Sequence, residues 1–128
     1  MMKLPAAVIC LLAVLICAGF TNASAPITVT DATFQTELEK GDTMMVFLWA
    51  EWNGPSRKMA PIIDELAEEY DGQLKIYKMN TDYNRVIPKT YGVHGLPTML
   101  FFKMGQVVDT LTGQQTKFKI ANTIARFM

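Results

Sequence analysis

The most informative segment of this 128-residue chain reads Phe47-Leu48-Trp49-Ala50-Glu51-Trp52-Asn53-Gly54-Pro55-Ser56. Its apolar beginning continues a run from residue 44 to residue 50, which predicts a strand that is buried on both faces. Asn is a preferred helix cap and Pro fits the first helical turn, so the end of the segment predicts a helix start. Apolar residues recur at helical spacing up to about residue 70. The segment therefore joins a buried strand to a long amphipathic helix.

On both sides of this unit, strand and helix patterns alternate. The predicted strands cover residues 26–30, 74–80, 98–103 and 106–112, and the further predicted helices cover residues 31–40, 84–90 and 116–127. Thr30 or Asp31 is expected to cap the first of these helices. Two β-α-β crossovers followed by a hairpin and a helix predict an α/β domain, with a central mixed β-sheet flanked by helices.

The first residues have the layout of a secretory signal peptide. Lys3 precedes an apolar run over residues 4–20, and small and polar residues follow at 21–25. We expect a leader of residues 1–23, with cleavage after Ala23 or elsewhere within 21–25, and a domain of residues 24–128. An uncleaved membrane anchor is the alternative, although the run is short for a span. The expected location is the ER lumen, the outside of the cell or a secretory-derived compartment, or the periplasm in a bacterium.

The chain has two cysteines, Cys10 and Cys17, and both lie in this leader. A processed chain would therefore contain no thiol, no disulfide and no thiolate metal ligand. Lys and Arg together number 12, as do Asp and Glu, so no basic excess indicates nucleic-acid binding. The only histidine, His94, is expected to be a polar surface residue. Because zinc spacings and phosphate loops are also missing, we expect neither a metal nor a cofactor.

Several blocks resemble the thioredoxin family over the whole predicted domain. Residues 47–56 resemble the family's second strand and active-site turn, and residues 80–82 resemble the end of its third strand. Tyr91-Gly92-Val93-His94-Gly95-Leu96-Pro97-Thr98 is similar to the family's cis-proline loop, and Gly113 to the glycine after its last strand. The sequence around residues 80–82 and near the C-terminus most resembles the m-type branch of the family. A leader on such a domain resembles the secretory s-type thioredoxins of plants. The resemblance implies the thioredoxin fold and a cis Leu96–Pro97 bond.

The active-site motif of the family is altered in this chain. Where the family has Trp-Cys-Gly-Pro-Cys, both cysteine positions differ and are occupied by Asn53 and Ser56. The family's buried acid, six residues before the first cysteine, is replaced by Phe47. An amide is not a nucleophile, and a serine hydroxyl stays protonated without a strong base nearby. No catalytic residue is therefore expected at this degenerate motif.

The binding surface of the family is largely present. In thioredoxins an extended client strand pairs with backbone beside the cis-proline, so binding does not itself require cysteine. The resemblance places the following residues at this surface: Trp52, Gly54, Pro55, Thr81, Gly95, Leu96, Pro97, Thr112 and Gly113. For Thr81 and Thr112, a purely structural role is as well supported as a role in binding.

Three functions remain open at this point. The leading expectation is a secreted, redox-inactive monomer that binds a polypeptide client or a partner protein noncovalently, as a chaperone-like, assembly or regulatory protein. It would bind no nucleic acid, and no membrane after cleavage. The first alternative is a thiol–disulfide oxidoreductase, as the family implies, that is weak or depends on an external thiol such as glutathione. The second alternative is a structural subunit whose groove has no function.

Overall fold

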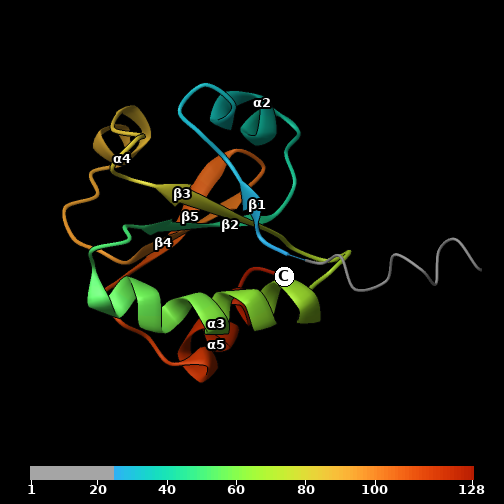
Figure 1. Cartoon of the computed structure of the whole chain (residues 1–128). Coiled ribbons are helices and arrows are strands. Elements are labelled where there is room, and N and C mark those ends of the chain that lie inside the picture. Colours follow the sequence, from blue (N-terminus) through green and yellow to red (C-terminus); the bar gives the residue numbers. More distant parts are fainter. Residues whose placement is uncertain (1–24) are drawn as a thin grey trace, which may run out of the picture.

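The computed structural model describes residues 25–128. They contain one five-stranded sheet, with the strands in the order β1-β3-β2-β4-β5. The strands are β1 (Ile27–Thr28), β2 (Met44–Trp49), β3 (Lys75–Asn80), β4 (Thr98–Lys103) and β5 (Gln106–Thr112). The helices are α2 (Phe34–Glu39), α3 (Gly54–Glu69), α4 (Val86–Thr90) and α5 (Lys117–Ala125). Strands β1, β3 and β2 are parallel, and β4 and β5 are antiparallel to their neighbours. Helices α2 and α4 cover one face of the sheet, and α3 and α5 cover the other (Figure 1).

The predicted α/β architecture with a mixed sheet is confirmed, and so are most of the element bounds. The hairpin strands agree with the prediction in full, whereas β1 has only two residues and α2 begins at Phe34. The predicted leader and its two cysteines lie outside the described residues. Within residues 25–128, no helix is both long enough and apolar enough to cross a bilayer.

The predicted cap of the first helix is wrong. Thr33 occupies the cap position of α2 without a side-chain bond to the helix. Thr30 closes the turn before α2: its hydroxyl accepts from the N–H of Thr33, and its carbonyl accepts from the N–H groups of Thr33 and Phe34. The carboxylate of Asp31 instead accepts from the N–H groups of Val86 and Ile87, at 3.0 and 2.9 Å, at the start of α4. Asp31 therefore caps a helix that begins about 55 positions later in the chain, because the end of β3 brings that helix beside the N-terminal segment.

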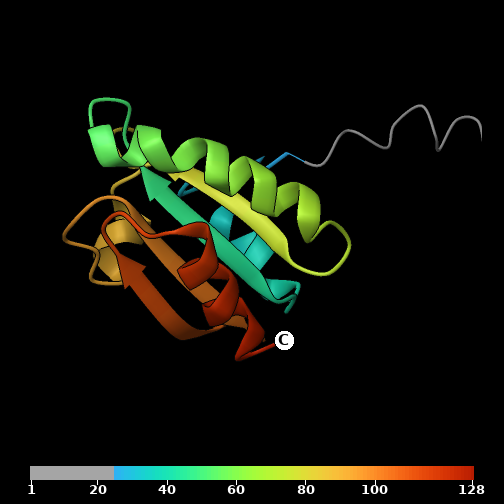
Figure 2. The same cartoon turned by 90° about the horizontal axis from the view of Figure 1, so that it is seen from below.

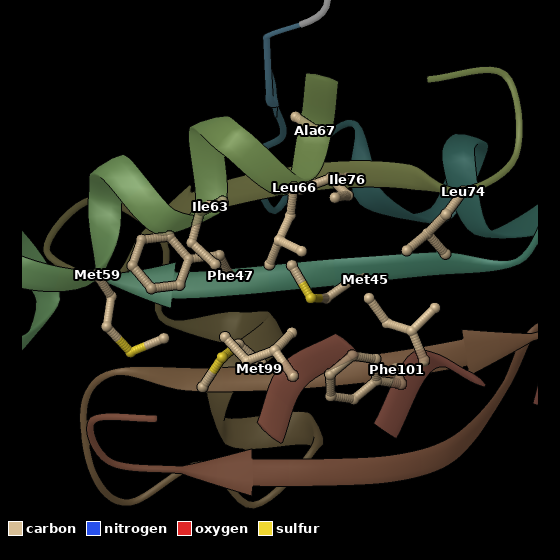
Figure 3. Packing of buried hydrophobic residues seen from close by; sticks show 12 residues of the cluster. Met45, Phe47, Met59, Ile63, Leu66, Ala67, Leu74, Ile76, Met99 and Phe101 are labelled. Carbon is tan, nitrogen blue, oxygen red and sulfur yellow. The ribbon is translucent and has the colours of Figure 1, made fainter. Parts of the chain in front are cut away.

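The sheet separates two hydrophobic cores. Alternate residues of β2 point to opposite faces, so Met45 and Phe47 join the core beneath α3 and α5, while Val46 and Leu48 join the core beneath α2 and α4. Figure 3 shows Phe47 under α3, beside Met59 and Ile63. All of β2 except Trp49 is buried, which confirms the predicted strand with two covered faces.

One polar contact reaches the edge of the second core. The Tyr77 hydroxyl donates a 2.7 Å hydrogen bond to a carboxylate oxygen of Glu37. This bond, with a further contribution from Lys40, lowers the pKa of Glu37. Burial, followed by the Glu37 contact, raises the pKa of Tyr77 above its ordinary value.

Replacing Tyr77 by phenylalanine is expected to make the free energy of unfolding change less between neutral and acidic pH. A carboxylate with a depressed folded pKa stabilises the fold above its unfolded pKa, and this contribution is lost as the pH falls through the folded pKa. Wild type should therefore exceed Tyr77→Phe in free energy of unfolding at pH 7, and the gap should narrow below about pH 4. Urea unfolding at several pH values measures this gap. A gap that stays constant from pH 7 to pH 3 would contradict the prediction.

Candidate functional site

The turn at the start of α3 is organised by Asn53. This residue has an extended backbone, and its side-chain oxygen accepts a 2.8 Å hydrogen bond from the N–H of Ser56. Pro55 occupies the first turn, as its fixed φ favours. The predicted cap is confirmed, and such a cap stabilises a helix by about 1 kcal/mol.

The position of the second family cysteine is enclosed. Ser56 is 1% exposed, and its hydroxyl oxygen is buried with no hydrogen-bond partner among the described residues. Leaving such a group unpaired costs about 1–3 kcal/mol. Phe47, at the position of the family's acid, is 2% exposed and packs in the core. Neither side chain supplies a base or a nucleophile.

The loop opposite this turn contains the expected cis bond between Leu96 and Pro97. The carbonyl of Pro97 accepts a 2.7 Å hydrogen bond from the N–H of Gly113, which joins the loop to the end of β5. The hydroxyl of Thr98 donates a 2.6 Å bond to the carbonyl of Gly95 within the same loop. Gly113 has a φ of 85°, a conformation that glycine adopts without strain. The cis-proline loop is therefore held from both sides.

Trp52 forms the exposed wall of the site. Its indole is 66% exposed, yet the ring N–H donates a 2.9 Å hydrogen bond to the Asp82 carboxylate. Thr81, which precedes Asp82 in the chain, donates both its N–H and its hydroxyl to the carbonyl of Trp49. The side chain of Thr81 is thus used by the fold, whereas Trp52 keeps its large apolar face open to solvent.

The topology brings all the predicted binding residues to one end of the sheet. Strands β2 and β3 end there, antiparallel β4 begins there and β5 ends there, so the α3 turn meets the cis-proline loop (Figure 2). The long helix α3 starts at this point, and the N-terminus of a helix carries a partial positive charge. The described residues contain no cluster of three or more potential metal ligands. The binding groove that the family resemblance predicts therefore consists here of the backbone of the cis-proline loop, the exposed ring of Trp52 and a weakly electropositive helix start.

A cavity that the sequence patterns do not predict lies beside the cis-proline loop. It has a volume of about 300 Å³ and is lined by Thr81, Asn84, Arg85, Pro88, Lys89, Gly92, Val93 and His94. The spacing of Arg85 and Lys89 by four positions near a short helix is the signal that could have placed their side chains on one face.

The model of the family described as thioredoxin matches residues 25–126. The chain belongs to the thioredoxin family. It is 45% identical over 101 residues to thioredoxin 1 of Synechococcus elongatus, covering 78% of this chain and 94% of that protein. It is 44% identical over 96 residues to thioredoxin of Pseudomonas aeruginosa, with 74% and 89% covered. It is 40% identical over 106 residues to thioredoxin 1 of Nostoc, with 82% and 99% covered.

These relatives correct the leading functional expectation. A redox-inactive protein that only binds polypeptides is contradicted, because relatives with 40–45% identity over most of the chain are named thioredoxin. The expectation rested on the replacement of Cys at two motif positions, whereas the similarity to these relatives extends over most of the chain. The comparisons favour the first alternative, an oxidoreductase of the thioredoxin type.

Proposed function

We propose that this member of the thioredoxin family is a thiol–disulfide oxidoreductase for protein disulfides that takes its thiols from a small external molecule such as glutathione. Family membership supports the reaction class. The observation that carries the external thiol is the helix start itself, where Asn53 and Ser56 stand in a chain whose residues 25–128 contain no cysteine. The groove beside Pro97 can still hold a disulfide while another molecule attacks it.

The chemistry requires two equivalents of the external thiol. The first thiolate attacks one sulfur of the client disulfide, so that a mixed disulfide forms and the other client sulfur leaves as a thiolate. A second thiolate attacks the sulfur of the external molecule in that mixed disulfide and releases the second client thiolate. The client gains two electrons and two protons, and the external thiols leave joined as one disulfide.

The contribution of the protein is to bind and to orient. A client segment in extended form would pair with the backbone of the cis-proline loop, with its apolar side chains against Trp52. The client sulfur would then lie near the start of α3, where the partial positive charge favours a departing thiolate. Such assistance acts without a covalent intermediate on this chain, so weak activity is expected.

The first residues keep their expected role in this proposal. Residues 1–23 would act as a secretory signal peptide, and processing would remove Cys10 and Cys17 with it. The N-terminal sequence of the exported chain tests this point. An exported chain that still begins at residue 1 would contradict it.

The test of the oxidoreductase uses the full chain, glutathione and a protein disulfide such as that of insulin. We expect a reduction rate above the protein-free blank, and an equal rate from the Cys10→Ser/Cys17→Ser variant, which has no thiol at all. A rate equal to the blank would overturn the proposed function. Loss of the rate in the double variant would overturn the external source of the thiol.

A substitution of Trp52 tests whether the groove takes part in the reaction. Trp52→Ala should lower the rate above blank by about tenfold, the usual effect of removing a large aromatic contact. Met104→Ala is the matched control, because this residue is 77% exposed and lies in the β4–β5 turn at the other end of the sheet. Equal rates from both variants would show that the groove is not used.

A further inference from the structure

The cavity beside the groove has a distinct electrostatic character. Two of the residues that line it, Arg85 and Lys89, are cationic and exposed, and none of them is acidic. Neither cation takes part in the salt bridges found within residues 25–128. The polar groups of Thr81 and Asn84, by contrast, are occupied by bonds within the fold. The free charge in the cavity is therefore positive.

Two acids close to α4 in the fold or in the chain, Asp31 and Asp82, do not line the cavity. Asp31 accepts two N–H groups at the start of α4, and Asp82 accepts the indole N–H of Trp52. Both carboxylates keep their negative charge, but neither lines the cavity, and neither forms a salt bridge with Arg85 or Lys89. The guanidinium of Arg85 can bind a carboxylate through two parallel hydrogen bonds, and Lys89 adds a point charge.

The position of the cavity connects it to the proposed reaction. His94 lies in its lining and is followed directly by Gly95, Leu96 and Pro97, the loop beside which a client disulfide would bind. A volume of about 300 Å³ is at the lower end of the range for small-molecule sites. A thiol that is one or two residue lengths from a carboxylate lies roughly 3.5–7 Å from it, which is the scale of such a cavity.

We propose that this cavity binds the carboxylates of the external thiol and so selects a small anionic thiol peptide, of which glutathione is the example. The inference rests on the proposed function and names its co-substrate. Arg85 and Lys89 hold the anionic end of the molecule, and its thiol points toward the cis-proline loop. Neutral thiols gain nothing from these charges, so they react without the benefit of the cavity.

The first experiment compares two reductants on the full chain. In the Arg85→Gln/Lys89→Gln variant, the ratio of the glutathione-driven rate to the dithiothreitol-driven rate should fall about tenfold, through a raised KM for glutathione. Lys58→Gln/Lys119→Gln is the matched control, since it removes two exposed charges from α3 and α5 on the other face of the sheet. An unchanged ratio would overturn the inference. A parallel fall with both reductants would also overturn it, because the cavity would then bind the client.

The second experiment separates binding from turnover. S-methylglutathione keeps both carboxylates but cannot exchange disulfides, so its titration into isotope-labelled full chain reports on the cavity alone. We expect saturable NMR shifts at the amides of Thr81, Gly92 and His94, and their loss in Arg85→Gln/Lys89→Gln. Shifts elsewhere or none at all would overturn the inference even if turnover occurs. Binding at the cavity without any turnover would instead overturn the proposed function, and the cavity would then be a binding site for an anionic peptide but not the site of a co-substrate.

Discussion

Replacing Asn53 and Ser56 together by cysteine is expected to raise the disulfide reductase activity by at least about 100-fold, because the second thiol then acts within the same molecule. The cap already brings the two positions together, since the Asn53 side chain contacts the Ser56 N–H at 2.8 Å. A thiolate at position 53 would also gain from the partial positive charge of the α3 start. Insulin reduction with dithiothreitol, followed against the protein-free blank, measures the gain.

The single variants are the controls for this gain. Asn53→Cys alone can form a mixed disulfide but cannot resolve it, and Ser56→Cys alone has a thiol that is buried at this position. Both should therefore remain well below the double variant. A double variant that reduces insulin no faster than the wild type would show that the groove no longer holds a disulfide in line with the helix start.

Replacing Phe47 by Asp is expected to destabilise the fold by about 3–5 kcal/mol, the range found when a buried aromatic side chain is removed. Phe47 is 2% exposed, and its ring packs against apolar neighbours under α3 (Figure 3). An ionised carboxylate there adds a desolvation cost. Lys78 lies opposite Phe47 in the β2–β3 register and lines the same small cavity, so an ion pair can offset only part of this cost.

Guanidinium unfolding of Phe47→Asp, with Phe47→Leu as the apolar control, tests this expectation. The control should lose less than about 1.5–2 kcal/mol, since it keeps most of the apolar contact. Burial raises the folded pKa of the new carboxyl above its unfolded value, so the deficit of Phe47→Asp is largest at neutral pH and shrinks as the pH falls. A deficit below about 1 kcal/mol at pH 7 would mean that the position still accommodates an acid.

The elements that the sequence predicts well are those determined by local patterns. The β2 strand and the start of α3 follow from an apolar run, a capping Asn53 and a proline in the first turn, all within about a dozen residues. The extent of β1 and the partner of Asp31 depend on contacts with residues about 50 positions away, and periodicity contains no information about such contacts.

The candidate site divides in the same way. The resemblance located the turn, the cis-proline loop and Gly113, because each is a short block with fixed spacing. The orphan hydroxyl of Ser56 could not be foreseen, since burial of a single serine depends on packing from several elements. The cavity with Arg85 and Lys89 could not be predicted either, because the sequence does not distinguish cations that line a cavity from other exposed cations.

The capping of α4 by Asp31 has a further consequence. Helix α4, which contains Lys89 and follows Arg85, donates its first two N–H groups to Asp31, a residue near the beginning of the described chain. A fusion, truncation or proteolytic cut that displaces the segment around Asp31 would therefore disturb the far side of the groove without touching it. The segment around Asp31 therefore helps to hold α4 and its cavity in place. Engineered variants of the N-terminus have to preserve this contact.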